Sequence, residues 1–327
     1  MVAELEAIGA RHVSLPLDRK SPQALVSNTR ALARLVRAEE VSILHARSRF
    51  PAWSGLLAAR QRGASFVTTF HGVYTEDLPG KRLYNSVMIR GDRVIAISDH
   101  VASVIRERYA VGPDRLRIIP RGVDVEAFNP DAVPPERIIA LRASWGVPEG
   151  RPVVMLPARL TRWKGAKVLL NALALLGSAA PYAILLGEGS FRSELEREVV
   201  TLGLHSLVVL PGLSHDMPAA LMVADLVLHT STKAEPFGRT VIGAQAMRRP
   251  VIASDLGAPR ETVVNGVTGW RVPPGDAEAL AAAINRALAL QPRAREVMGG
   301  RGRAAVLAHY TTTAMQAATL SVYQELL

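Results

Sequence analysis

Short apolar runs alternate with amphipathic stretches from one end of the chain to the other. In the first part, five runs have the length and composition of buried strands: 12–15, 41–45, 65–70, 93–97 and 116–119. Between the first two, residues 23–37 place leucines on one face and arginines on the other, the pattern of a surface helix. Ser98 is the expected N-cap of a helix that ends near Tyr109. Alternation of this kind predicts an α/β fold with parallel sheets covered by helices on both faces.

A second alternating series follows a proline-rich segment, 129–148, which indicates a boundary between two domains. After it we expect strands at 153–156, 183–186, 207–210, 226–229 and 251–253. Helices are expected at 166–176, 192–202, 217–223 and 238–247, and further helices from residue 276 close the chain. The pattern predicts two domains, 1–133 and 134–311, and a final helix at 312–327.

Composition narrows the class of protein. The 327 residues are 49% hydrophobic and 21% charged, which is typical of a globular enzyme and excludes bulk disorder. There are no cysteines, hence no disulfides and no thiolate metal site, which fits a reducing cytoplasm. No apolar run is long enough to cross a bilayer, because the richest, 168–186, is interrupted by Asn171, Gly177 and Pro181. The N-terminus does not have the layout of a signal peptide.

The formal net charge of +10 suits polyanionic partners such as nucleotide diphosphates, an anionic membrane surface or nucleic acid. Nucleic acid is disfavoured because only 5% of residues are aromatic and no basic stretch is interleaved with stacking rings. A generally basic proteome explains the charge equally well.

The most informative segment is 230–240, TSTKAEPFGRT. It follows an apolar run that predicts a buried strand and leads into helix formers, so Glu235 and Gly238 are expected where a strand's carboxyl end passes into a helix. Open α/β sheets bind ligands at that edge, and a helix N-terminus offers N–H groups to an anion. A carboxylate and a glycine loop there can hold sugar hydroxyls and phosphate. The alternative is an ordinary loop with an exposed glutamate.

Together with four further segments in the same order, this segment makes the chain resemble the family-4 retaining glycosyltransferases of GT-B fold. The four are FHG at 70–72, IPRGVD at 119–124, ARLTRWKG at 158–165 and LGEG at 186–189. The resemblance implies two Rossmann-like parallel-sheet domains that face each other across a cleft. It implies transfer of a sugar from a nucleotide-sugar donor to a glycan or lipid-linked acceptor, in lipopolysaccharide or another surface-glycan pathway, at the inner face of the plasma membrane.

The resemblance also bears on both ends of the chain. In this family the last helix crosses back onto the N-terminal domain, so 312–327 is expected there. Such a domain normally opens with a strand, a glycine-rich loop and a helix, and none of these is found before residue 12. The chain is therefore expected to be N-terminally shortened, with an open apolar edge on the first sheet.

Arg159 and Lys164 flank a turn after the strand 153–156, just before a helix that opens at Gly165. A guanidinium and an ammonium at a helix start suit a diphosphate, and each charge-assisted hydrogen bond contributes roughly 1.5–3 kcal/mol. In the resembled family the matching residues neutralise the leaving nucleotide diphosphate. No metal is then expected, there is no Asp-x-Asp motif, and the nucleotide sugar is a substrate rather than a cofactor. Two solvated surface cations are the alternative.

The resemblance assigns further roles around the donor. Glu235 accepts hydrogen bonds from the sugar hydroxyls, and the amides near Phe237, Gly238 and Arg239 hold the sugar and the phosphates. His71 reaches from the N-terminal domain toward the donor sugar or the acceptor. The family's second glutamate, eight positions after Glu235, normally contacts the ribose, and here that position is Gly243.

Several other positions complete the predicted site. Gly187 and Gly189 form a tight turn after a strand, where a base or ribose can approach the backbone. Arg121, in the loop 119–124, is expected near the cleft. Arg47 and Arg49 follow the strand 41–45 and are predicted to recognise an anionic acceptor.

Two other functions compete with glycosyl transfer. A catalytically impaired relic or partner subunit, which binds without turnover, would account for Gly243 and the missing N-terminal unit. A nicotinamide-dependent dehydrogenase is disfavoured because no G-x-G-x-x-G follows a first strand. No carboxylate pair of the kind that retaining glycosidases use is apparent. The resemblance implies instead a front-face substitution in which an oxygen of the leaving diphosphate takes the acceptor's proton.

Overall fold

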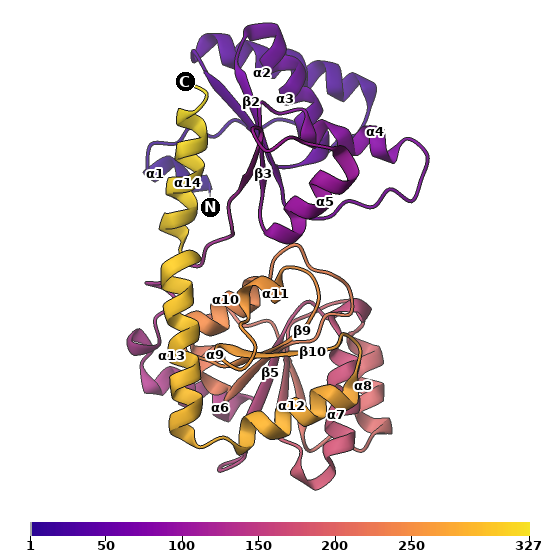
Figure 1. The fold of residues 1–327 in the computed structure, drawn as a ribbon, viewed down its shortest axis with the longest axis vertical. Coiled ribbons are helices and arrows are strands. Elements are labelled where there is room, and N and C mark those ends of the chain that lie inside the picture. Colours follow the sequence, from indigo (N-terminus) through magenta and orange to yellow (C-terminus); the bar gives the residue numbers. More distant parts are fainter. Residues whose placement is uncertain (1) are drawn as a thin grey trace. The chain divides into compact units, whose positions relative to one another are not determined.

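A computed structural model describes residues 2–327 as a succession of parallel β/α units (Figure 1). The chain divides into two compact units. The first comprises the residues up to Ile97, Ala102–Ile118 and Leu320–Leu327; the second comprises Ser98–Val101 and Ile119–Thr319. Each unit has its own parallel sheet, so the predicted α/β class with two Rossmann-like sheets is confirmed. Residues 119–133, predicted in the first domain, group with the second unit.

The sheet of the first unit has four parallel strands in the order β1-β2-β3-β4. They are β1 (Ile43–Ala46), β2 (Ser65–Phe70), β3 (Arg93–Ala96) and β4 (Leu116–Ile118), and each overlaps a predicted strand. The strand predicted at 12–15 is wrong, because residues 11–16 have no ladder partner. His12 and Val13 are exposed, so this run buries too little apolar surface to join the sheet.

Helices of the first unit follow the amphipathic stretches of the sequence. They are α1 (Val2–Ala7), α2 (Pro22–Ala38), α3 (Arg49–Arg62), α4 (Lys81–Asn85), the 3₁₀ turn η1 (Ser86–Ile89) and α5 (Asp99–Tyr109). Helix α2 begins at Ser21, whose Oγ accepts the Ala24 N–H at 3.1 Å. Ser98 Oγ accepts the Val101 N–H at 3.1 Å, which confirms the predicted cap of α5.

The sheet of the second unit has six parallel strands in the order β10-β9-β8-β5-β6-β7. They are β5 (Val153–Pro157), β6 (Tyr182–Leu186), β7 (Val208–Gly212), β8 (Leu226–His229), β9 (Val251–Ser254) and β10 (Gly269–Val272). Five were predicted within two residues. Strand β10 was not, because it is a four-residue edge strand that starts at a glycine and contains an arginine, and so lacks a continuous apolar run.

Helices cover both faces of this second sheet (Figure 1). Val154 and Leu156 of β5 point to the face covered by α7 (Ala166–Leu176), α8 (Arg192–Thr201) and α12 (Ala277–Ala289). Val153 and Met155 point to the other face, covered by α6 (Pro135–Ser144), α9 (Met217–Val223) and α10 (Arg239–Ala246). With both faces buried, the carboxyl edge of the strands is where polar side chains can gather.

The remaining elements are short turns and the closing helices. They are η2 (Pro130–Ala132), η3 (Arg162–Lys164), η4 (Gly177–Ala179), α11 (Pro259–Thr262), α13 (Pro292–His309) and α14 (Thr312–Gln324).

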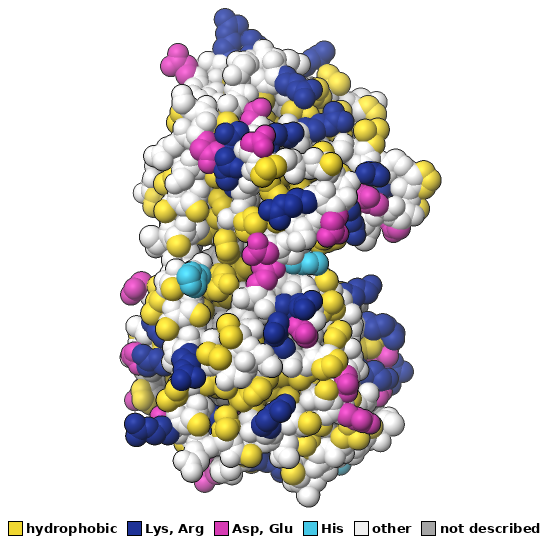
Figure 2. All heavy atoms as spheres, in the orientation of Figure 1, with side chains coloured by type: hydrophobic (Ala, Val, Ile, Leu, Met, Phe, Trp, Pro, Cys, Tyr) yellow, Lys and Arg dark blue, Asp and Glu magenta, His cyan; other side chains and the backbone are white. Residues whose placement is uncertain are grey.

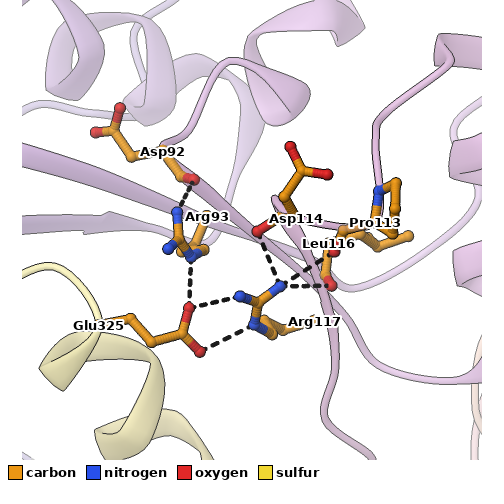
Figure 3. A network of polar contacts seen from close by, with 7 residues as sticks. All are labelled: Asp92, Arg93, Pro113, Asp114, Leu116, Arg117 and Glu325. Atoms are coloured by element: carbon orange, nitrogen blue, oxygen red, sulfur yellow. Dashed lines mark hydrogen bonds and ion pairs between the residues drawn. The ribbon is translucent and has the colours of Figure 1, made fainter.

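Glu325, just after α14, ties the end of the chain to the first sheet (Figure 3). Arg117 of β4 donates to both carboxylate oxygens, at 2.9 and 2.7 Å, and Arg93 of β3 donates to one of them at 2.6 Å. The Arg117 hydrogen bond, and then the Arg93 one, lower the pKa of Glu325 to about 2. Arg117 Nη1 also donates to three backbone carbonyls, two in the loop before β4 and one in the strand (Pro113, Asp114 and Leu116).

The positive charge is unevenly divided between the units. The first unit has 18 Lys and Arg against 11 Asp and Glu, an excess of 7, and the second has 21 against 18, an excess of 3. On the face drawn in Figure 2, acidic side chains are interspersed among the basic ones rather than absent. No helix within residues 2–327 is long and apolar enough to cross a bilayer.

Candidate functional site

Glu235 lies at the carboxyl edge of the second sheet, in the loop between β8 and α10. Its side chain is buried, although it belongs to a loop. The loop is held from the neighbouring strand connection, since Glu235 bridges Gly257 and its carbonyl accepts the Ala258 N–H at 3.0 Å. The strand-to-helix position predicted for Glu235 is confirmed.

Three side chains converge on one oxygen of this carboxylate, Oε1. Lys164 Nζ donates to it at 2.6 Å, and Ser231 Oγ donates to the same atom. His229 Nε2 lies 2.9 Å from it, without the alignment of a hydrogen bond. The structure therefore joins Glu235 and Lys164, which were both predicted site residues, and adds His229 and Ser231.

The charge on Glu235 is maintained in spite of its burial. Burial by itself raises the pKa of a carboxyl group, but contact with His229 and with the Lys164 ammonium outweighs it and lowers the pKa of Glu235 to about 2. Glu235 is thus a carboxylate at neutral pH. It can accept charge-assisted hydrogen bonds from hydroxyl groups.

Lys164 is positioned by the loop that connects β5 to α7. Thr230 Oγ1 donates to the carbonyls of Lys164 and Gly165, at 3.2 and 3.1 Å, and the Thr232 N–H donates to Trp163 O at 2.8 Å. The Lys164 ammonium also lies 4.5 Å from the centre of the Trp163 ring. These bonds place the lysine loop directly beside the loop of Glu235.

Arg159 lies on the same β5–α7 connection, two residues beyond the end of the strand, and its side chain is exposed. Gly187 and Gly189, which follow β6, pack against Ala158 and Leu160, the residues on either side of Arg159. A Cβ added to Gly187 would lie 2.0 Å from Ala158 O, and one added to Gly189 would lie 2.2 Å from Leu160 O. These glycines therefore allow two loops to meet at backbone distance.

The N-terminus of α10 follows Glu235 closely. Gly238 is its first flanking residue and Arg239, which is exposed, its first helical one. Phe237 is buried, with its ring 6.1 Å from that of Tyr310, so its side chain belongs to the core and only its backbone is available to a ligand.

A cavity of about 510 Å³ lies alongside α10. Arg239, Thr240, Ile242 and Gly243 line it from the helix, and its other walls are mainly apolar (Val123, Phe128, Pro157, Met217 and Leu221). A Cβ on Gly243 would meet only ordinary contacts, 3.5 Å from Phe128 and 4.0 Å from Leu221. Where the resemblance expects a second glutamate, this chain has a buried glycine that lines the cavity.

In the first unit, His71 and Arg47 lie together at the carboxyl edge of the sheet. Arg47 Nε donates to His71 Nε2 at 3.1 Å. Beneath them His45 contacts Tyr323 Oη through Nδ1 at 2.6 Å and Thr69 Oγ1 through Nε2 at 2.7 Å. Burial, and then the positive charge of Arg47, lower the pKa of His45 to about 4, so it is neutral near pH 7.

The other two arginines predicted near the acceptor or the cleft, Arg49 and Arg121, lie in different units. Arg49 donates to Asn85 Oδ1 at 2.8 Å and stacks over Tyr74, 4.4 Å from the ring centre, so its guanidinium is already occupied. Arg121 is partly exposed in the second unit, between Pro120 and Gly122.

The two residues that the sequence did not reveal, His229 and Ser231, have a recognisable signal in retrospect. Each is a polar residue at or just after the end of an otherwise apolar buried strand, which is the place where ligand-facing side chains occur in α/β sheets.

Within residues 2–327 no three His, Cys, Asp or Glu side chains are grouped to hold a metal ion.

Comparison with known proteins agrees with this geometry. Residues 138–305 match the family described as "Glycosyl transferases group 1", and residues 2–127 match "Glycosyltransferase Family 4". A D-inositol 3-phosphate glycosyltransferase of Saccharomonospora viridis is 29% identical, over 95% of this chain and 77% of that protein.

Solved structures agree as well. A glycosyltransferase from Rickettsia africae superposes with a TM-score of 0.93 at 32% identity, over 99% of this chain and 87% of that one. Anabaena HepE, solved in complex with UDP, superposes with a TM-score of 0.82 at 25% identity, over 95% of this chain and 84% of that one.

Proposed function

Because this chain belongs to the glycosyl transferases group 1, we propose that it is a retaining enzyme that transfers a sugar from a nucleotide-sugar donor to a glycan or lipid-linked acceptor. The observation that carries the proposal is the pairing of Glu235 with Lys164 beside the N-terminus of α10. That arrangement sets a carboxylate for sugar hydroxyls next to a cation and a helix start for a diphosphate.

In the proposed donor complex the diphosphate lies between Lys164, Arg159 and the first amides of α10, and the sugar lies against Glu235. The relative from Anabaena, solved with UDP, supports a nucleotide as the leaving group. Lys164 and Arg159 would supply the positive charge that a metal supplies in other transferases, so we expect activity to persist in the presence of EDTA.

We propose front-face substitution for the chemical step. The bond from the anomeric carbon to the phosphate oxygen breaks through an oxocarbenium-like state while the acceptor oxygen bonds to the same face. A diphosphate oxygen takes the acceptor's proton, and Lys164, Arg159 and the dipole of α10 stabilise the departing negative charge. His71, held by Arg47, would support the donor sugar or the acceptor from the first unit.

The acceptor in this proposal is anionic or membrane-bound, and the pathway is the synthesis of lipopolysaccharide or another surface glycan in the cytoplasm, at the inner membrane face. The excess of positive charge on the first unit supports it, as does the inositol phosphate named for the relative from Saccharomonospora viridis. Arg47 and Arg121 are the proposed contacts to that acceptor, whereas Arg49 is held by Asn85 and Tyr74.

A second candidate function, binding without turnover, is favoured by one observation. Gly243 leaves an open wall in the cavity beside α10, where a carboxylate for the ribose is expected. The loss of one charge-assisted hydrogen bond weakens nucleotide binding by roughly 1.5–3 kcal/mol.

Thermal unfolding with UDP, GDP and ADP tests donor binding, and we expect one of them to raise the melting temperature. The matching nucleotide sugar, labelled in the sugar, then distinguishes the two candidates. Release or transfer of labelled sugar supports the enzyme, and stabilisation without any release supports the non-catalytic reading. Stabilisation by none of the three nucleotides contradicts both. The anomeric configuration of a transferred sugar, measured by NMR, tests retention.

A further inference from the structure

The buried histidine at the end of β8, His229, has no part in the function proposed so far. Its side chain is 6% exposed, and neither ring nitrogen has a hydrogen-bond partner of acceptable geometry. A buried polar group without a partner destabilises the folded protein. Because Nε2 lies 2.9 Å from Glu235 Oε1, the ring is placed to act on that carboxylate.

In the ligand-free protein, Lys164 and His229 both lie against Oε1 of Glu235. The Lys164 ammonium, 2.6 Å away, already neutralises it, and Ser231 donates a further hydrogen bond. A positive charge on His229 would add a second cation beside Lys164 and leave a buried Nδ1–H without an acceptor.

A bound donor changes the charges around Lys164 and Glu235. A nucleotide diphosphate carries at least two negative charges at neutral pH and competes with a single carboxylate for the ammonium of Lys164. Glu235 is 7% exposed, so water cannot take over when the lysine turns away. Removal of one partner of a buried ion pair is strongly destabilising, which favours uptake of a proton by a nearby group.

We propose that His229 replaces Lys164 as the cationic partner of Glu235 when a donor binds, so that donor binding takes up one proton from solvent. This rests on the proposed function, since the diphosphate must draw Lys164 away. The lysine is then free to stabilise the leaving group, while the carboxylate that holds the sugar stays ionised and oriented. His229 is a positioning residue, because it acts on the donor through Glu235.

Charged groups on the elements packed around β8 do not take this role. Strand β5 leads to Arg159, and α10 begins with Arg239; both are exposed at the sheet edge. Strand β9 leads to Asp255, which is paired with Arg260 at 3.0 Å and with Arg271 at 3.3 Å. Among residues 2–327, Lys164 and His229 are the cationic or protonatable side chains that contact Glu235.

Calorimetric titration measures the proton directly. UDP-glucose and GDP-mannose are the probes, and the one that raises the melting temperature is titrated in two buffers of different ionisation enthalpy at one pH. We expect about one proton to be taken up per donor bound, and an affinity that falls by up to tenfold per pH unit as the pH is raised.

Two variants localise the proton. His229→Gln should bind the donor without proton uptake. The matched control, His205→Gln, changes an exposed histidine between α8 and β7 and should retain the uptake. Nitrogen NMR of the histidine rings in the unaltered chain gives a readout that does not depend on a variant's folding, and one ring should become doubly protonated when the donor binds.

The possible results distinguish failure of the His229 proposal from failure of the proposed function. Donor binding without proton uptake, uptake that persists in His229→Gln, or a His229 ring already doubly protonated in the free protein would each overturn the inference and leave the function standing. Failure of both probes to bind, as well as of UDP, GDP and ADP, overturns the function and the inference together.

Discussion

At the scale of single residues, the centre of the site is an ion pair that is mostly withdrawn from water. The Lys164 side chain is 18% exposed and that of Glu235 is 9% exposed, whereas the nearby pair of Lys167 and Glu198 is 46% and 22% exposed. A buried pair and a surface pair of the same chemistry therefore occur within one unit, which makes their contributions directly comparable.

Lys164→Met should destabilise the ligand-free protein by about 3 kcal/mol, because it leaves the buried carboxylate of Glu235 without its ammonium. Lys167→Met should cost at most about 1 kcal/mol, as surface pairs do. Urea unfolding at pH 7 measures both. Lys164→Met with Glu235→Gln should recover part of the loss, since the buried charge is then removed as well. An equal decrease in the free energy of unfolding for the two lysine variants would show that burial does not make the Lys164–Glu235 pair contribute more than the surface pair.

Residues at strand ends could be predicted because the sheet edge gathers them. Glu235 and Lys164 were recognised from loops that follow apolar strands, and the structure brings them to 2.6 Å. His229 was taken only as the end of a strand, because its ring orientation depends on packing between β8 and its neighbours, which no sequence spacing gives. The same limit holds for Arg49, whose place in the sequence suggested a ligand but whose guanidinium is engaged by Asn85.

At the scale of elements, burial decided which strands could be predicted. Residues 65–70 and 226–229 were predicted with their observed bounds, because these buried parallel strands are rich in apolar, aromatic and β-branched residues. The two errors have the opposite cause: strand β10 forms without a continuous apolar run, and the apolar run 12–15 does not form a strand. A short edge strand needs little apolar sequence, and a short apolar run without a partner forms no strand.

Gly165 connects the lysine loop to α7, and its environment predicts a large effect of substitution. Its φ is +74°, and an added Cβ would lie 1.8 Å from Thr230 O, the backbone next to the Glu235 loop. Gly165→Ala should destabilise the protein by about 2–4 kcal/mol, from left-handed strain plus overpacking, and should weaken nucleotide binding by displacing Lys164.

Gly203 is the matched control for Gly165. Its φ is +67°, but an added Cβ would meet nothing within 4 Å, so Gly203→Ala should cost only about 1 kcal/mol and leave nucleotide binding unchanged. Urea unfolding and the nucleotide-induced rise in melting temperature measure the two effects. A Gly165→Ala protein as stable as Gly203→Ala would show that the lysine loop is free to move away from Thr230.

At the scale of the whole molecule, the chain passes between its units four times. Ser98–Val101 is a short excursion into the second unit; the chain enters that unit again at Ile119 and returns to the first at Leu320, so the last residues complete a unit that the first residues began. The sequence pattern predicted the final helix, but the ion pairs that anchor its end were not predictable, since Glu325 is more than 200 positions from both Arg93 and Arg117.

Glu325→Gln tests whether this closing contact stabilises the first unit. The pKa of Glu325 is lowered from 4.5 to about 2 by Arg117 and Arg93, so its carboxylate stabilises the folded state fully above about pH 4.5 and loses that effect as the pH falls toward 2. The variant should therefore melt at a lower temperature than the unaltered protein at pH 7, and the difference should shrink as the pH is lowered through this window. Glu107→Gln, an exposed change on α5, is the control and should melt with the unaltered protein throughout.

Hydrogen exchange shows which part of the protein is destabilised in Glu325→Gln. Because Glu325 is paired with Arg93 of β3 and Arg117 of β4, amides of the first sheet should exchange faster in Glu325→Gln, while those of the second sheet should keep their protection. Faster exchange in both sheets would mean that the two units unfold as one cooperative body. Unchanged exchange in both would mean that these exposed ion pairs add no stability, as holds for many surface pairs, and that the end of the chain is retained by apolar contacts such as buried Val322.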